Sequence, residues 1–437
     1  MTSKIRVAIT GIGLVTPAGH DVQSTWSRLK SARGCAAPIS IFDASGFSTR
    51  IAAEVPDVDK LPDIDDRKLL KYASRAHRFA LAAADQALAD AGIRPTLSDA
   101  SRWGCVVGAG MMSVAHDEIA AVQREAAIDG ELNANALLQV PVANDVMAFS
   151  RSLSTAGISL LLRRYGIRGY ASTVHTACAS GGQAVGTALR IIRRGLADCV
   201  LTGGFDSMIS PVGLSGFCLL SAVSPDNDNP ARASRPFDVT RNGFVLGEGA
   251  GFLVLESWDR AVARGATIYA ELAGDGNSLS SYRITDSHPS GDGPIQSMRR
   301  AIADAGAGIQ DFDYLNAHGT STPMNDRSEC AAVRAVFGDY AGHVAVSSTK
   351  SVMGHLIAAA GAVEAAVCAL AIKEGCMPPN ANLQQVDPDC DVNIVRDVPR
   401  QGKIRMALSN SLGFGGSNST LAFRHPEETA ALIARGL

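Results

Sequence analysis

Three side chains with nucleophilic or acid–base chemistry stand in similar local contexts. Cys178, within Thr176-Ala-Cys-Ala-Ser-Gly-Gly182, lies at a predicted strand-to-helix junction. A helix N-terminus favours a thiolate through its free amides and partial positive charge, so this context predicts a lowered thiol pKa. His318 and His355 each follow a predicted buried strand and are flanked by glycine and hydroxyl residues. Taken alone, each of these residues is more typical of a hydrophobic core than of a site. Strand ends converge on the ligand crevice of an α/β sheet, however, so we expect the three residues to share one site.

The elements that must position these residues alternate between strands and helices. Strands are predicted at 4–16, 103–110 and 198–204, and helices at 21–31, 66–92, 179–194 and 355–373. This alternation predicts an α/β fold with parallel strands and right-handed crossovers. Helices 179–194 and 355–373 carry few charges, which predicts that they are buried between sheets. Comparable units at 173–205 and 314–375 indicate duplicated halves, 1–260 with the cysteine and 261–437 with the two histidines.

Composition excludes several classes of function. The 437-residue chain is 46% hydrophobic and 19% charged, which is typical of a globular protein. Its net charge of −3 argues against general nucleic-acid or membrane binding. We find no signal peptide and no membrane span in the sequence. The nine cysteines are irregularly spaced and fit neither a disulfide framework nor a zinc site, so we expect a reducing cytoplasm and no catalytic metal.

Six segments, in order along the chain, carry a resemblance. The chain resembles the elongating β-ketoacyl-acyl carrier protein synthases, which implies a thiolase-like fold with a layered α-β-α-β-α body. The segments are Thr176-Ala-Cys-Ala-Ser-Gly181, Asn227-Asp-Asn-Pro230 with Ser234-Arg-Pro-Phe-Asp238, Gly243-Phe-Val-Leu-Gly-Glu-Gly-Ala-Gly251, His318-Gly-Thr-Ser-Thr-Pro323, Ser348-Thr-Lys-Ser-Val-Met-Gly-His355 and Asn410-Ser-Leu-Gly-Phe-Gly-Gly416.

The resemblance implies a decarboxylative Claisen condensation. Cys178 takes an acyl group from a carrier-protein thioester, and the enolate of a malonyl carrier then attacks that acyl-enzyme. The side chains of His318 and His355 stabilise the enolate, and the backbone amides of Cys178 and Phe414 form the oxyanion hole. No cofactor is expected to be bound, because the acyl carrier protein supplies the phosphopantetheine.

The resemblance assigns further residues to the site. Lys350 and Glu364 are the family's lysine and carboxylate, although a buried ion pair with a structural role explains them equally well. The substrate-binding residues are Thr320 and Thr322 for the pantetheine arm, Gly413 and Gly415 around the gating Phe414, Met111 at the far end of the acyl tunnel, and Thr285. A structural monovalent cation is expected near Asn316, Glu364, Ser409 and Asn410.

A basic stripe is predicted on helix 66–92. Arg67, Lys71, Arg75 and Arg78 have helical spacing, and Lys68 lies beside them. By resemblance, Arg67, Lys68 and Lys71 meet an acidic acyl carrier protein. A solvated helix face is the alternative.

Departures from the family pattern keep other functions open. Arg283 stands where a histidine is common, Met353 replaces a small or hydroxyl residue, and residues 123–152 match weakly. The nearest alternative is a ketosynthase subunit of a type II polyketide or polyene pathway, acting as a heterodimer instead of the expected homodimer. The presence of Cys178 argues against a chain-length subunit without activity. The two-histidine pattern argues against a thiolase, and the ordered motifs argue against a cysteine protease.

Overall fold

The computed structural model describes residues 4–61, 66–110, 120, 124, 126–128, 131–133, 135, 146–283, 285 and 288–436. Its largest element is a ten-stranded mixed sheet in the order β12-β11-β15-β16-β10-β1-β9-β8-β4-β7. The strands are β1 Val7–Val15, β4 Trp103–Ala109, β7 Ala171–Val174, β8 Cys199–Ser207, β9 Glu248–Ser257, β10 Ala270–Leu279, β11 Phe312–Asn316, β12 Ala345–Ser347, β15 Met406–Leu412 and β16 Ser417–Arg424. Three two-stranded antiparallel sheets add β2 Ala37–Pro38 with β3 Ile51–Ala52, β5 Ala127–Ile128 with β6 Glu131–Leu132, and β13 Cys376–Met377 with β14 Arg400–Gln401.

The same strand order recurs in both parts of this sheet. From its outer edge inwards, the first half has the order β7, β4, β8, β9, β1, and the second half has the order β12, β11, β15, β16, β10. In both halves these are the third, second, fourth, fifth and first strands along the chain. The halves join where β1 and β10 pair antiparallel, with Ala8 opposite Glu271 and Ile9 opposite Ala270. A repeated strand order without repeated sequence explains why only the pattern of elements indicated duplication. The boundary at residue 260 stays a prediction.

Helices cover the sheet and also separate its two parts. The helices are α1 Val22–Lys30, α2 Arg67–Leu70, α3 Arg75–Ala91, α6 Val146–Ser152, α7 Ala156–Tyr165, α8 Ser180–Arg193, α9 Pro211–Leu219, α10 Pro230–Ala233, α11 Trp258–Ala263, α12 Asp292–Asp304, α13 Pro323–Phe337, α14 Lys350–Met353, α15 Ala360–Glu374 and α16 Pro426–Ala434. Short 3-10 turns lie at η1 Val58–Lys60, η2 Ala100–Arg102, η3 Ile309–Asp311, η4 Gly338–His343, η5 Ile357–Ala359, η6 Pro388–Cys390 and η7 Phe414–Gly416.

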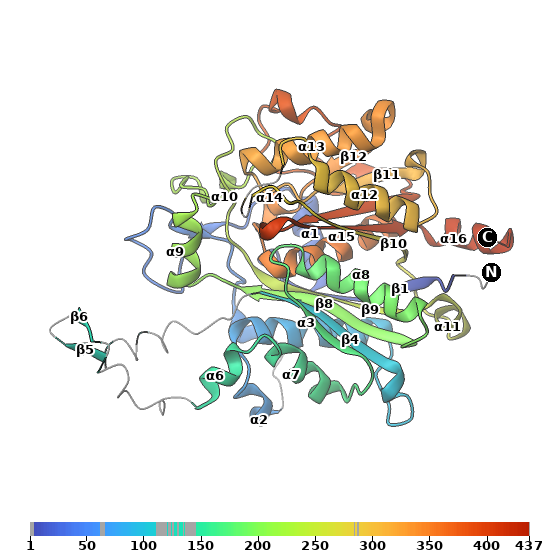
Figure 1. Ribbon diagram of the computed structural model, residues 1–437, viewed down its shortest axis with the longest axis horizontal. Coiled ribbons are helices and arrows are strands. Elements are labelled where there is room, and N and C mark those ends of the chain that lie inside the picture. The colour runs from blue at the N-terminus through green and yellow to red at the C-terminus, as the bar shows by residue number, and fades with distance from the viewer. Residues whose placement is uncertain are drawn as a thin grey trace.

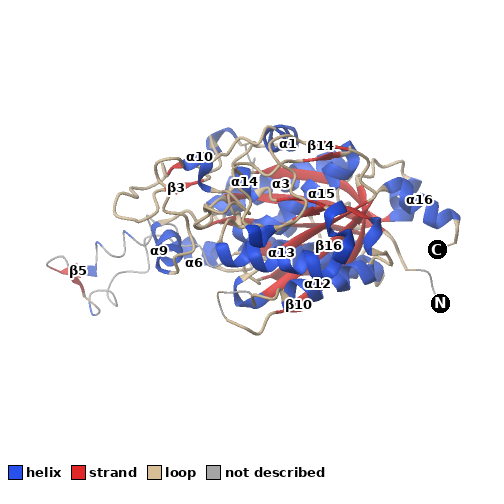
Figure 2. Ribbon diagram, turned by 90° about the horizontal axis from the view of Figure 1, so that it is seen from above, coloured by secondary structure: helices blue, strands red, loops and turns tan. Residues whose placement is uncertain are grey.

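The layers follow the predicted α-β-α-β-α arrangement (Figure 1). Helices α3 and α7 pack on the strands of the first half, and α12 packs on β10 and β16 of the second half. Helices α8 and α15 contact strands of both halves, so they form the middle layer. Every residue of α15 from Ala360 to Ile372 is buried, because a helix between two sheets has no solvent-facing side. The chain ends described here lie at one end of the molecule (Figure 2).

The middle helices cross at unusually short range. A Cβ atom added to Gly361 of α15 would lie 2.5 Å from the backbone nitrogen of Gly182 of α8. Any side chain at this crossing would therefore push the helices apart. The crossing brings the start of α8, which follows Cys178, close to the start of α15, which follows His355.

The prediction of one helix over residues 66–92 is wrong. The chain forms α2 and then leaves the helix until Ser74, which caps α3 with extended backbone angles. The Ser74 side chain accepts the amide hydrogen of His77, and the His77 ring accepts the amide hydrogen of Ser74. This reciprocal cap begins a new helix, with histidine in the place where Glu or Gln gives the recognisable signature.

No helix among the described residues is long and apolar enough to cross a bilayer.

Candidate active site

Cys178 sits at a sharp turn between β7 and α8. Ala177 has a left-handed φ of 50°, and Cys178 precedes Ala179, the N-cap of α8. Ser180 fixes the turn, because its Oγ accepts from the Thr176 amide at 2.9 Å and donates to the Ala177 carbonyl at 2.6 Å. A non-glycine residue in the left-handed region is unfavourable and persists where the surrounding structure imposes it. Here it directs the thiol of a 5% exposed cysteine into the site.

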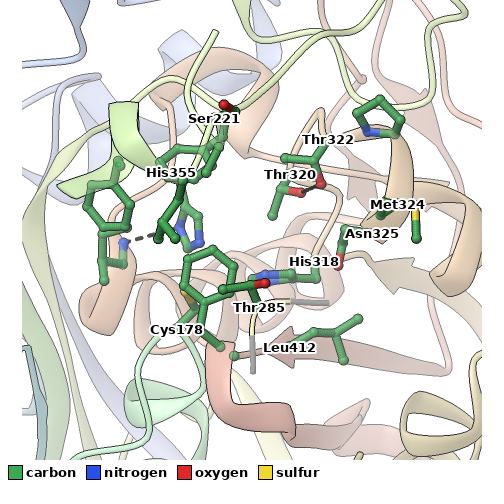
Figure 3. Close-up of a pocket in the computed structure, with 18 of the residues that line it drawn as sticks. Cys178, Ser221, Thr285, His318, Thr320, Thr322, Met324, Asn325, His355 and Leu412 are labelled. Carbon is green, nitrogen blue, oxygen red and sulfur yellow. Dashed lines mark hydrogen bonds between the residues drawn. The ribbon is translucent and has the colours of Figure 1, made fainter. Parts of the chain in front are cut away.

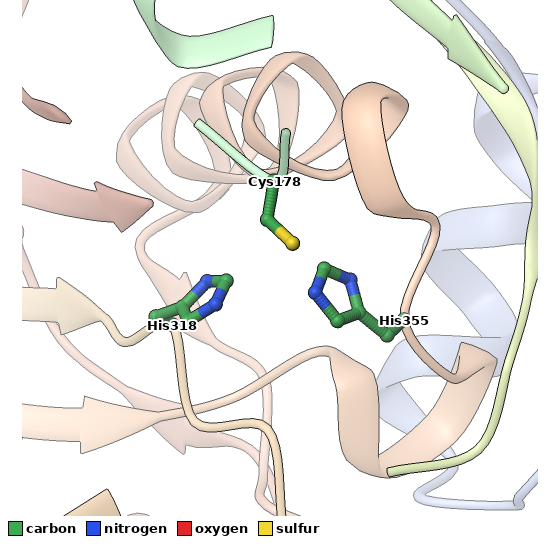
Figure 4. A group of neighbouring side chains, drawn as sticks. All are labelled: Cys178, His318 and His355. Carbon is green, nitrogen blue, oxygen red and sulfur yellow. The ribbon is translucent and has the colours of Figure 1, made fainter. Parts of the chain in front are cut away.

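The two histidines flank this sulfur. The Cys178 Sγ and one ring nitrogen from each of His318 and His355 all lie within 4.8 Å of one another. The imidazole ring centroids are 5.2 Å apart, and the ring planes are inclined by 83°. Figure 4 shows the sulfur pointing between the rings. The structure therefore brings together the three residues expected to share a site, and their catalytic roles stay predictions.

His355 is held in one tautomer by the backbone. Its Nδ1 accepts the amide hydrogen of Ile357 at 3.1 Å, so the ring proton resides on Nε2. Burial lowers the pKa of His355 well below its usual value, and the charge of Lys350 lowers that pKa further. The ring is thus neutral and carries a hydrogen-bond donor.

Glu329 of α13 anchors the His318 turn. Its carboxylate accepts the amide hydrogens of His318 and Gly319, both at 2.8 Å, and the Nδ2 hydrogen of Asn410 at 3.0 Å. Burial raises the pKa of Glu329 to about 7. Sequence reasoning missed this residue, although a glutamate on the apolar face of the α13 helical pattern was an available signal.

The His318 ring is neutral for the same reasons as that of His355. Burial lowers its pKa well below the usual value, and the nearby Lys350 and His355 add to this shift. Its Nδ1 has no hydrogen-bond partner among the described residues. This nitrogen is one of the few buried polar side-chain atoms of the described residues that have no partner.

Lys350 and Glu364 form a fully buried ion pair. Nζ of Lys350 donates to Oε1 of Glu364, and each side chain is 2% exposed. Burial raises the pKa of Glu364, against the opposing effect of Lys350. The pair supplies a fixed positive charge that disfavours protonation of both histidines.

The prediction of a lowered Cys178 pKa is wrong for the free enzyme. Burial raises the pKa of the thiol to about 12, and the charge of Asp206 acts in the same direction. Lys350 and the backbone amides of Phe414 and Cys178 lower the pKa, but these effects do not offset the loss of solvent. The resting nucleophile is therefore a thiol, whose proton must move as the sulfur attacks.

Two backbone amides point at the reacting atom. The N–H groups of Cys178 and Phe414 both interact with Sγ, so both amides lie beside the atom to which an acyl group would be attached. Phe414 begins η7, where Gly415 has a φ of 81°. A Cβ at Gly413 would come within 2.7 Å of the Thr176 carbonyl oxygen, so glycine lets this loop approach the cysteine turn.

A cavity of about 230 Å³ opens onto the three residues (Figure 3). Thr285, Thr320 and Thr322 contribute to its wall, and the hydroxyls of Thr320 and Thr322 are hydrogen-bonded at 2.9 Å. The remaining lining is largely apolar and includes Phe217 and Phe244. A largely apolar cavity with a few hydroxyls in its wall suits a small ligand arm that carries both apolar and polar groups.

The predicted cation site keeps buried polar atoms without partners. The side chain of Asn316, Oε2 of Glu364 and Oγ of Ser409 have no hydrogen-bond partner among the described residues. Oxygen donors of this kind fit a monovalent cation. The Asn410 side chain already has partners, because it donates to Glu329 and accepts from Thr420, and its part in a cation site stays a prediction.

The other predicted residues lie elsewhere. Met111 is outside the described residues. The side chains of Arg67, Lys68 and Lys71 are exposed and do not line the cavity. Arg75, expected on the same surface, instead donates to the buried Glu248 at 2.8 Å.

Two of the residues that depart from the family pattern lie among the described residues. The Met353 side chain is 1% exposed and belongs to the main hydrophobic core. The guanidinium of Arg283 lies 5.3 Å from the centre of the Tyr282 ring. Neither residue contributes to the cavity wall.

Comparisons with known proteins agree along the whole chain. Residues 4–261 match the beta-ketoacyl synthase N-terminal domain, and residues 269–384 match the C-terminal domain. A 3-oxoacyl-[acyl-carrier-protein] synthase 2 of Synechocystis is 38% identical over 96% of this chain and 98% of its own. A type II PKS ketosynthase, solved in complex with its acyl-carrier protein, has a TM-score of 0.86 at 30% identity, covering 97% and 100% of the chains. The ishigamide ketosynthase/chain length factor has a TM-score of 0.85 at 34% identity, covering 97% and 99%.

The fold and the family matches define an acyltransferase of the thiolase-like class. The chain belongs to the beta-ketoacyl synthase family.

The raised pKa of Cys178 predicts how the free enzyme reacts with iodoacetamide. Because a thiolate is the reacting form, we expect the alkylation rate to rise about tenfold per pH unit without a plateau below pH 10. Intact-mass kinetics between pH 6 and 10 measure this, and Cys178→Ala corrects for the partly exposed Cys35 and Cys218. A plateau near pH 8 would show that the helix start outweighs burial.

Proposed function

We propose that this enzyme is a β-ketoacyl-acyl carrier protein synthase of fatty acid-type chain elongation, which condenses an acyl-enzyme thioester with a malonyl carrier protein. The observation that carries the proposal is a buried thiol within 4.8 Å of ring nitrogens from two neutral imidazoles, all three lining one cavity. Phosphopantetheine arrives on the carrier protein and is not a resident cofactor.

The first step loads the enzyme. The Cys178 sulfur attacks the thioester carbonyl of the acyl carrier, and the amides of Cys178 and Phe414 stabilise the oxyanion. The carbon–sulfur bond to pantetheine then breaks. The proton lost by the cysteine thiol leaves with the pantetheine thiol, so this step is balanced without an external acid.

The second step makes the carbon–carbon bond. The bond between the malonyl group and its free carboxylate breaks, carbon dioxide leaves, and the electron pair forms an enolate. Nε2–H of His355 donates to the enolate oxygen, and His318 contributes a second ring N–H. The enolate carbon attacks the acyl-cysteine carbonyl and the carbon–sulfur bond to Cys178 breaks. The released thiolate then takes up one proton from solvent water, which the reaction consumes overall.

A second pathway remains a candidate. The similarity to a type II PKS ketosynthase and to a ketosynthase/chain length factor, both at 30% identity or more, favours a polyketide or polyene ketosynthase subunit. Strand β7 supports dimer formation in either case. It lies at the edge of the sheet, and among the described strands it pairs only with β4, so its other side is open to pairing with a partner chain. The partner is a second copy in the primary proposal and a chain-length subunit in the alternative.

A monovalent cation and a carrier-docking surface complete the proposal. Asn316, Glu364 and Ser409 would hold the cation through their unpartnered oxygens, and its role would be structural. Arg67, Lys68 and Lys71 offer exposed positive charge on and just after α2 to an acidic carrier protein. The break between α2 and α3 limits this surface to α2 and its following turn.

Sequential loading tests the main proposal. Wild-type enzyme is incubated with a panel of acyl carrier thioesters and then with malonyl carrier protein, and intact masses are recorded at each stage. We expect an acyl adduct, absent in Cys178→Ala, that converts to a β-ketoacyl carrier after malonyl addition. The preferred acyl group then narrows the pathway. A folded homodimer that takes no acyl group from any carrier would favour the heterodimeric alternative.

Charge reversal tests the docking surface. Arg67→Glu with Lys71→Glu should raise KM for carrier-bound substrate about tenfold at low salt and spare a small acyl thioester, because the carrier alone meets this surface. Arg194→Glu with Arg435→Glu changes the same charge at exposed positions elsewhere and serves as the control. Equal KM changes in both double variants would contradict docking at α2.

Thermal unfolding tests the cation site. Potassium or sodium chloride should raise Tm by about 2 °C or more over N-methylglucamine chloride at equal ionic strength, because a cation that binds the native state alone stabilises it. Ser409→Ala, which removes one unpartnered oxygen, should abolish this difference. Wild-type Tm values that are identical in all three salts would exclude a bound cation.

A further inference from the structure

A strained turn separates His355 from α15. Ile357 has a left-handed φ of 48°, which is rare for a β-branched residue. The amide of this residue is the donor that fixes the tautomer of His355. The strained residue is therefore also the one whose amide fixes the His355 tautomer. Contacts from outside the turn must hold Ile357 in this conformation.

Asp206 holds the turn from one side. This residue lies near the end of β8 and is 4% exposed. Its Oδ2 accepts the amide hydrogen of Ala358 at 3.0 Å, and its Oδ1 accepts that of Ser207 at 2.8 Å. Gly110 makes room for the carboxylate, because a Cβ there would lie 2.2 Å from Oδ2.

Two glycines confine the same residue from the other side. A Cβ at Gly181 would lie 2.8 Å from the carbonyl oxygen of Ala358, and a Cβ at Gly204 would lie 2.7 Å from it. Ala358 is thus held at its amide by a carboxylate and at its carbonyl by closely packed backbone. Of these contacts, the Asp206 hydrogen bond is the one that a near-isosteric substitution removes.

We propose that Asp206 is a positioning residue that holds the Ile357–Ala358 turn and thereby keeps His355 as the Nε2–H tautomer. The functional part of this inference rests on the proposed condensation, in which that proton is donated to the enolate. Asp206 is not among the residues that line the active-site cavity.

The chemistry of an amide makes Asp206→Asn informative. A carboxylate has two acceptor oxygens for Ser207 and Ala358, whereas an amide has one acceptor, and its NH2 group opposes the other backbone N–H. The variant keeps the side-chain volume and loses one hydrogen bond. The turn can then relax, and the amide of Ile357 no longer enforces one tautomer.

The experiment separates condensation from loading. Enzyme with Cys178 already acylated is mixed with malonyl carrier protein, and single-turnover product formation is followed. We expect Asp206→Asn to reach full acylation but to condense about tenfold or more slowly, because an enolate donor is misplaced. Glu271→Gln, a buried carboxylate paired with Arg6 and Arg424, is the control for general destabilisation and should condense at the wild-type rate.

Ring nitrogen shifts provide a readout that does not depend on activity. In protein labelled with ¹⁵N-histidine, the signals of His355, assigned with a His355→Gln variant, should indicate Nε2–H in wild type and a mixture of tautomers in Asp206→Asn. Gly110→Ala should cause the same change, because it displaces the carboxylate without altering it.

The outcomes are distinct. Unchanged His355 shifts in both variants overturn the inference, as does an equal slowing of loading and condensation with the wild-type tautomer retained. If wild-type enzyme fails to condense any malonyl carrier, the proposed function fails, while a tautomer change in Asp206→Asn still supports the positioning role.

Discussion

The close crossing of α8 and α15 is the constraint on which the site depends. Gly182 and Gly361 meet where no Cβ fits, so the two helix starts approach within the middle layer. The start of α8 follows Cys178, and the start of α15 follows His355. A larger residue at either glycine would separate the thiol from its donor, although neither glycine touches the cavity. Packing between helices of opposite halves thus sets the distance between Cys178 and His355.

Burial then sets the protonation states that this arrangement uses. Solvent exclusion keeps the Cys178 thiol protonated and both imidazoles neutral, and the Lys350–Glu364 pair favours the same imidazole state with its positive end. An imidazolium would stabilise an enolate more strongly, but it would also hold the malonyl carboxylate and oppose its loss. Neutral N–H donors avoid that cost and stabilise charge where it develops.

Sequence patterns predicted the parts of the structure that local rules determine. Strands near β1, β4 and β8 and the buried helices α8 and α15 follow from runs of apolar residues, and the convergence of strand ends followed from topology. The break before Ser74 did not, because histidine is an unusual partner in a capping box. The thiol pKa was also mispredicted, since the helix start is visible in sequence but the depth of burial is not. Asp206 was missed because it contacts the amide of Ala358, 152 residues further along the chain. Glu329 is only 10 and 11 residues from the amides that it accepts, but its place in a helical pattern does not show which backbone groups it meets.

The thiol and the histidines together constrain how protons move. The loading step releases a proton from Cys178 and gives one to the departing pantetheine, so its balance is internal. Condensation differs, because the cysteine sulfur leaves as a thiolate. The earlier loss of carbon dioxide releases no proton that could neutralise this thiolate. A thiol whose pKa is about 12 in this environment is a strong base when ionised, and it recaptures a proton readily. The burial that slows the attack of Cys178 thus favours return of the enzyme to its resting state. Because no thiolate is present before the substrate binds, other effects must lower the barrier to loading. These are the oxyanion hole and the positioning of the bound thioester next to the sulfur.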